Sequence, residues 1–200
     1  MVLMFKVGLI VIVLLSGLRH AGAQKAAAGV NSNRLSAISL VQVATDKKTS
    51  VNIAGKPLTL FVFLSPECPL SQNYTKVINT IADQYKETIK VYGIVPGDAY
   101  TVKEAADFMD KYQLAFDLLI DPQQLLTKKL QATITPQAIL VNAHEIKMYS
   151  GAIDNWVIAL GKKRAHVTEH YVVNAIEQSL QNTVVAVQST VAIGCRINDY

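Results

Sequence analysis

The chain has 200 residues, which suits one ordinary domain with short appendages and excludes a large multidomain assembly. Half of its residues are hydrophobic and 17% are charged, so the chain can bury a core and is not a disordered polymer. The formal net charge is +4, but the only dense basic run is Lys162-Lys163-Arg164, which we interpret as a solvated helix end, and we expect no nucleic-acid partner.

Residues 1–23 have the residue order of a secretory signal peptide. Lys6 precedes the apolar run 7–18, and Ala21-Gly22-Ala23 supplies the small residues of a cleavage site. The run is too short to span a bilayer comfortably, so a membrane attachment would exist only through this segment if it stays uncleaved. We expect an exported protein, periplasmic or extracellular. Its expected parts are a signal (1–23), a flexible N-terminal segment (24–35), a folded domain (36–182) and a tail (183–200).

Hydrophobic patterning predicts alternating strands and helices in the first half of the domain. Residues 36–52 alternate around Asp46-Lys47-Lys48, as in a hairpin at a sheet edge, and the apolar run 58–64 predicts a central strand buried on both faces. Apolar residues at helical spacing follow Pro69. Further along, the pattern predicts a strand over 89–95, a helix over 101–112 with a Thr101 cap and Glu104 three residues on, a strand over 116–120 and a short helix over 122–130.

The second half predicts an antiparallel pair, a last helix and a tail. Residues 138–141 and 145–149 form the expected pair around the turn 142–144, and Thr168 caps a helix that carries apolar residues to Leu180. The tail from 184 to 197 is β-like. The pattern indicates an α/β fold with a central mixed β-sheet flanked by helices, an N-terminal hairpin and a β-like C-terminal tail.

Cys68 stands where the central strand passes directly into a helix. A thiol at a helix N-terminus faces unpaired N–H groups and the positive end of the helix dipole, which both favour the reactive thiolate. Glu67 is expected to oppose this effect and raise the pKa of the thiol. Ser71 occupies the position where a dithiol enzyme keeps its second cysteine, so the site is a one-thiol version, and Cys195 is the only other cysteine in the chain.

The order of elements resembles the thioredoxin-like superfamily over residues 36–182, and its redoxin and peroxiredoxin branch most closely. The resemblance rests on Ser65-Pro66-Glu67-Cys68-Pro69-Leu70-Ser71 and on Ile134-Thr135-Pro136-Gln137. It implies a cis-proline beside the redox cysteine, so that Ser65, Ser71, Thr135 and Pro136 would shape the pocket of Cys68.

The resemblance to peroxidases of this branch is incomplete. Their motif has a proline and a threonine where this chain has Phe61 and Ser65, and Arg34, Arg164 and Arg196 all lie away from the expected position of the peroxide-binding arginine. Peroxidase, and hence antioxidant, activity is therefore the weaker expectation. A thiol-disulfide oxidoreductase or redox-partner protein with Cys68 as the attacking thiolate is the stronger one.

The segments Tyr149–Asp154 and Thr190-Val191-Ala192-Ile193-Gly194-Cys195-Arg196-Ile197 resemble exported bacterial redoxin-domain proteins, some of which are joined to c-type cytochrome modules. The resemblance implies a tail that returns along the sheet and brings Cys195 near Cys68. Three outcomes stay open: Cys195 resolves the reaction, it forms a permanent structural disulfide, or it does not pair. The expected partner is a thiol or disulfide protein, a small thiol, or a respiratory or c-type cytochrome component.

A rival hypothesis is a non-catalytic binding or metal-carrier module. Cys68, Cys195 and His170 could bind a soft ion such as Cu(I), although their spacing forms no compact ligand motif. The sequence contains no motif for an organic cofactor, and we expect none.

Overall fold

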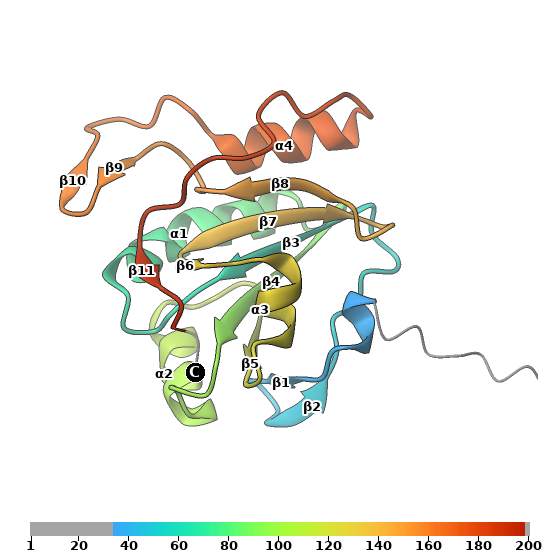
Figure 1. The fold of residues 1–200 in the computed structure, drawn as a ribbon, viewed down its shortest axis with the longest axis vertical. Coiled ribbons are helices and arrows are strands. Elements are labelled where there is room, and N and C mark those ends of the chain that lie inside the picture. The colour runs from blue at the N-terminus through green and yellow to red at the C-terminus, as the bar shows by residue number, and fades with distance from the viewer. Residues whose placement is uncertain (1–33, 199–200) are drawn as a thin grey trace, which may run out of the picture. The chain divides into compact units, whose positions relative to one another are not determined.

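The computed structural model describes residues 34–198. Their main feature is a seven-stranded sheet with strand order β2-β1-β5-β4-β3-β7-β8 (Figure 1). The strands are β1 (Leu40–Gln42), β2 (Lys47–Thr49), β3 (Leu58–Phe63), β4 (Ile89–Pro96), β5 (Asp117–Asp121), β7 (Gln137–Asn142) and β8 (Lys147–Gly151). The helices are the 3-10 turn η1 (Leu35–Ala37), α1 (Pro69–Gln84), α2 (Val102–Lys111), α3 (Leu125–Leu130) and α4 (Tyr171–Leu180). The expected signal segment lies outside the described residues.

The sheet is mixed, as the sequence predicts. Strand β3 runs parallel to β4 and antiparallel to β7, while β4 and β5 are parallel and β7 and β8 antiparallel. All residues of β3 are buried, which agrees with a central strand covered on both faces. Strand β2 lies at the edge and pairs only with β1 within the sheet, so the expected edge hairpin is present.

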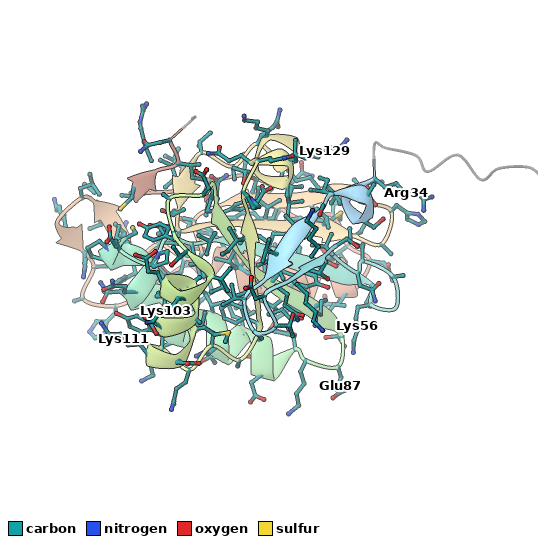
Figure 2. All side chains as sticks on the ribbon, turned by 90° about the horizontal axis from the view of Figure 1, so that it is seen from below. Arg34, Lys56, Glu87, Lys103, Lys111 and Lys129 are labelled. Atoms are coloured by element: carbon teal, nitrogen blue, oxygen red, sulfur yellow. The ribbon has the colours of Figure 1, made fainter. Side chains whose placement is uncertain are left out.

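Two hydrophobic clusters cover the two faces of this sheet. Leu60 and Val62 of β3 join the cluster that contains the buried residues of α1, α2 and α4. Phe61 and Phe63 alternate with them and join the cluster that contains η1 and α3. Charged side chains stay at the outside: Figure 2 shows Lys103 of α2 pointing away from the sheet. The described part of the chain contains no helix that is long and apolar enough to span a membrane.

Two small sheets lie outside this main sheet. Strand β6 (Ile134–Thr135) pairs with β11 (Cys195–Arg196), and β9 (Val157–Ala159) pairs with β10 (Lys162–Lys163). The basic run is therefore part of an exposed hairpin, and its interpretation as a helix end is wrong. The ring of Trp156 lies against the Lys163 ammonium, and the Arg164 N–H donates to the Trp156 carbonyl, which supports the hairpin.

Three other predicted boundaries differ from the structure. Helix α4 begins at Tyr171 rather than after Thr168, because the Thr168 N–H and hydroxyl are already bonded to the Asn155 side chain. Leu35, which the sequence places in a flexible segment, is buried in η1. The tail after α4 is mostly irregular: apart from β11, it forms one isolated bridge between Ser189 and Ser150.

Candidate functional site

The thiol of Cys68 lies at the start of α1, directly after the end of the central strand. Cys68 is the N-cap residue and Pro69 the first helical residue, where the missing N–H of proline costs no helix hydrogen bond. The expected passage from strand to helix is thus present. Cys68 is only 2% exposed, so the sulfur is enclosed at the positive end of the helix dipole.

The residues expected around Cys68 come together in the structure. The Cys68 thiol donates to the Thr135 carbonyl oxygen at 3.2 Å, and the Thr135–Pro136 peptide bond is cis. The Ser71 hydroxyl accepts the Ser65 backbone N–H at 3.2 Å, which leaves the Ser71 O–H free to interact with the sulfur. By contrast, Phe61 is fully buried within β3 and does not belong to the site.

The tail is anchored on β8 before it reaches the thiol. The Thr190 hydroxyl lies 2.6 Å from the Tyr149 hydroxyl and accepts the Ala152 N–H at 2.9 Å. A side chain at Gly151 would collide with the Thr190 hydroxyl and backbone. Tyr149, Gly151 and Thr190 therefore form one joint between the tail and β8, which Figure 1 shows side by side.

Beyond that joint, the tail crosses β6 and brings the second cysteine to the first. Strand β11 pairs Cys195 with Thr135, and the Ile197 N–H donates to the Thr133 carbonyl at 3.0 Å. A Cβ at position 194 would clash with the Thr135 carbonyl, so only glycine permits this approach. Both cysteines are free thiols in this state; Cys68 is buried and Cys195 is exposed.

The two thiols shift each other's pKa in opposite directions. Burial raises the pKa of Cys68, but interactions with the Cys195 thiol, the Ser71 N–H, the Cys195 N–H and the Ser71 hydroxyl outweigh it, and the net pKa is lowered. Burial and the neighbouring Cys68 raise the pKa of Cys195 to about 11. Of the two sulfurs, the buried one therefore has the lower pKa and loses its proton first as the pH rises. Glu67 is not among the groups that shift the pKa of Cys68, because its carboxylate is exposed and screened by solvent.

A cavity of about 300 Å³ adjoins the thiol pair. Ser65 and Thr135 line it from the Cys68 side, and Arg196 lines it from the tail. Sequence reasoning missed Tyr100, whose hydroxyl lies 2.9 Å from the Ser65 hydroxyl, and Glu104. No pattern pointed to Tyr100, whereas Glu104 was predicted only as a helix cap.

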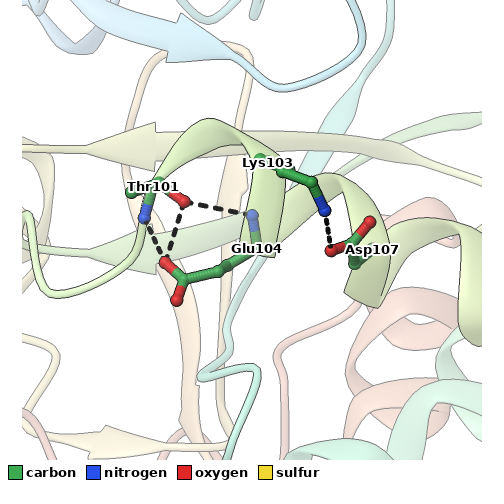
Figure 3. A network of polar contacts seen from close by, with 4 residues as sticks. All are labelled: Thr101, Lys103, Glu104 and Asp107. Atoms are coloured by element: carbon green, nitrogen blue, oxygen red, sulfur yellow. Dashed lines mark hydrogen bonds and ion pairs between the residues drawn. The ribbon is translucent and has the colours of Figure 1, made fainter.

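Glu104 reaches this cavity while it closes the capping box of α2. Its carboxylate accepts the Thr101 N–H at 2.8 Å, and its own N–H donates to the Thr101 hydroxyl at 3.2 Å (Figure 3). The predicted cap is thus present. The neighbouring pair of Lys103 and Asp107 lies on the exposed surface of the same helix.

The alternative metal site does not form. His170 is exposed at the start of α4, and over residues 34–198 no three His, Cys, Asp or Glu side chains gather in a way that could hold a metal ion. The structure thus brings the two cysteines together without the expected third ligand.

Replacing Ser71 by alanine should raise the pKa of Cys68. The variant removes a hydroxyl whose interaction lowers that pKa, so the thiolate should appear at higher pH than in the unchanged protein. Thiolate absorbance in the ultraviolet, followed against pH, measures the shift. Ser179→Ala in α4 is the matched control, because it removes a hydroxyl that is not among the groups that shift the pKa of either thiol. An unchanged titration of Cys68 in Ser71→Ala would contradict this account.

Comparison with known protein families gives one match. The model of the AhpC/TSA family matches residues 34–150, which include Cys68, Ser71, Thr135 and Pro136. The tail with Cys195 lies beyond the matched residues. No curated protein matches the chain.

Solved structures with a similar fold include three that cover most of the chain. A hypothetical protein from Sinorhizobium meliloti has a TM-score of 0.71 and 23% identity, and covers 80% of this chain and 89% of its own. An uncharacterized conserved protein from Geobacillus kaustophilus has a TM-score of 0.71 and 18% identity, and the match covers 82% of this chain and 88% of that protein. A putative thioredoxin from Neisseria meningitidis has a TM-score of 0.56 and 16% identity, and the match covers 72% of this chain and 88% of that protein. At these identities the likeness establishes the thioredoxin-like fold.

Proposed function

The chain belongs to the AhpC/TSA family, and we propose that it is an extracytoplasmic thiol-disulfide oxidoreductase in which Cys68 and Cys195 form the working redox pair. One observation carries the proposal. Strand β11 places Cys195 opposite Thr135, whose carbonyl oxygen accepts the Cys68 thiol, so the two cysteines share one site although they lie far apart in the sequence.

The difference in exposure assigns a role to each sulfur. In the oxidised protein, an external thiolate attacks the exposed sulfur of Cys195, the S–S bond breaks, and its electron pair leaves with Cys68. Cys68 is the better leaving group because its pKa is lowered, whereas that of Cys195 is raised. A second thiolate then attacks the external sulfur of the mixed disulfide and releases Cys195, which takes up a proton.

The reverse direction uses Cys68 as the attacking thiolate. The Cys195 thiolate first attacks an external disulfide and expels one external thiolate, and the Cys68 thiolate then attacks the Cys195 sulfur of the mixed disulfide and expels the second external thiolate. Ser71 stabilises the thiolate, and its hydroxyl is itself held by the Ser65 N–H. The Thr135 carbonyl oxygen accepts the S–H of Cys68 while the thiol is protonated, and Pro136 follows Thr135 in the cis form.

The proposed location outside the cytoplasm is supported by residues 1–23 and by the cysteine content. The basic, apolar and small residues of that segment have the order of a secretory signal. A two-cysteine pair is stable in the oxidised form in such compartments. The proposed partners are therefore exported thiol or disulfide proteins and small thiols.

The state of the two cysteines after export tests this function. We expect an intact Cys68–Cys195 bond in the isolated protein, two accessible thiols after mild reduction, and a reduction potential above about −250 mV, in the range of working redox pairs. Thiol counting by mass spectrometry, followed by equilibration in redox buffers, measures all three.

Two results would contradict the proposal. A bond with a potential below about −300 mV would identify a structural disulfide. Two thiols that stay free under oxidising conditions, together with stoichiometric copper lost in Cys68→Ala, would identify a metal carrier.

A further inference from the structure

The cavity beside the thiol pair contains groups that the redox step itself does not use. Glu67 precedes Cys68 in the chain and Arg196 follows Cys195, and both line this cavity of about 300 Å³. Glu104 and Tyr100 contribute from the segment that begins α2. The cavity is thus lined by the chain neighbours of both reacting cysteines and by Thr135, the residue that pairs with Cys195.

The charged side chains that line the cavity have opposite signs and do not form ion pairs with each other. In residues 34–198, no salt bridge joins Arg196 to Glu67 or Glu104. Glu104 uses one carboxylate oxygen in the capping box, while Glu67 is exposed. A cation and a carboxylate at the two sides of one cavity match a ligand that carries a carboxylate and an ammonium group.

The size of the cavity limits the ligand. A volume of about 300 Å³ lies at the lower end of the range for small-molecule sites, which suits a molecule of amino-acid size better than a protein loop. We propose that this cavity binds a small amino-acid thiol such as free cysteine; this proposal rests on the proposed redox function. Arg196 binds its carboxylate, Glu67 binds its ammonium group, and its sulfur faces Cys195.

The bound thiol then acts as the electron donor. It loses its proton to solvent, its thiolate attacks Cys195 in the oxidised protein, and Cys68 leaves as thiolate. A second thiolate attacks the ligand sulfur of this mixed disulfide. The products are the reduced protein and the symmetrical disulfide of the ligand, with two electrons transferred. Binding of the charged groups accelerates the first attack because it holds the sulfur beside its target.

Four small thiols with different charged groups test the proposal on the oxidised full-length protein. Cysteine carries both charged groups, 3-mercaptopropionate only the carboxylate, cysteamine only the ammonium group, and 2-mercaptoethanol neither. Reduction rates are followed by mass spectrometry, divided by the thiolate fraction of each reagent and compared with its rate on a small reference disulfide, so that neither ionisation nor intrinsic nucleophilicity decides the order. We expect cysteine to react about tenfold faster than 2-mercaptoethanol, as charge-assisted contacts to partly exposed groups allow.

Two variants separate the two contacts. Arg196→Gln should abolish the preference for 3-mercaptopropionate over 2-mercaptoethanol, and Glu67→Gln should abolish the preference for cysteamine. Each variant is judged by the ratio of two rates in the same protein, so a general change in Cys195 reactivity cancels. Arg164→Gln and Glu169→Gln are the matched controls, since both residues are exposed and neither lines the cavity.

The outcomes distinguish this inference from the function on which it rests. Equal corrected rates for all four thiols, or preferences that survive in both Arg196→Gln and Glu67→Gln, would overturn the proposed ligand while the redox function stands. If no thiol reduces the Cys68–Cys195 bond, both proposals fall. Charge preferences that vanish only in the two cavity variants support the proposed ligand.

Discussion

Cys68→Ser should eliminate catalytic thiol–disulfide exchange, because serine can form no disulfide with Cys195 and supplies no thiolate. The variant keeps Cys195, which is exposed and should still form a mixed disulfide with a small disulfide reagent. That mixed disulfide should persist, since the buried thiolate that would resolve it is gone. Turnover is measured with a protein disulfide substrate, and the trapped species by mass spectrometry.

Cys195→Ser is the paired experiment. It keeps the nucleophile at the start of α1 but removes the exposed sulfur. Turnover should fall strongly, because serine cannot form the mixed disulfide with an external partner. Retained turnover in Cys68→Ser would disprove the role of the buried thiol, and full turnover in Cys195→Ser would show that an outside thiol resolves the reaction.

Gly194→Ala should uncouple the two cysteines without touching either of them. The added methyl group clashes with the Thr135 carbonyl, so β11 can pair with β6 only if the backbone shifts. Overpacking of this kind costs about 1–3 kcal/mol, which is enough to detach a two-residue strand while the main sheet stays folded. Alkylation of Cys68 should then become at least about tenfold faster, because a detached tail exposes the sulfur.

Gly161→Ala is the matched control for this prediction. Unlike Gly194, Gly161 has a positive φ, of 76°, and a Cβ there meets no neighbouring atom, so the variant adds backbone strain away from the thiols without a steric clash. It should leave the alkylation rate of Cys68 unchanged. Equally slow alkylation and equally ready disulfide formation in Gly194→Ala would show that the tail does not control access to Cys68.

Local signals in the sequence sufficed for much of the fold and for half of the site. The apolar run into Cys68-Pro69 predicts the passage from strand to helix, and Thr101 with Glu104 predicts the cap, because neighbours in the chain determine both. The resemblance supplied Thr135 and Pro136. The passage and the cap do not depend on how distant segments pack, whereas the contact of Thr135 with Cys68 does.

The remainder depends on contacts between segments that no local pattern encodes. The meeting of Cys195 with Cys68 follows from the fit of Gly194 against Thr135 and from the joint of Thr190 with Tyr149, which only a folded sheet brings together. The predicted cap at Thr168 fails for the same reason. The side chain of Asn155, between β8 and β9, accepts the Thr168 N–H and donates to the Thr168 hydroxyl, and the helix begins later.

The pairing of β11 with β6 also ties the redox state of the protein to its resistance to heat. A bond between the first turn of α1 and the last strand encloses most of the described fold in one covalent ring. Closing so long a loop restricts the unfolded chain by about 4–5 kcal/mol on the loop-entropy model. The melting temperature should therefore fall by several degrees on reduction, so that a thermal scan alone distinguishes the oxidised from the reduced form of the protein.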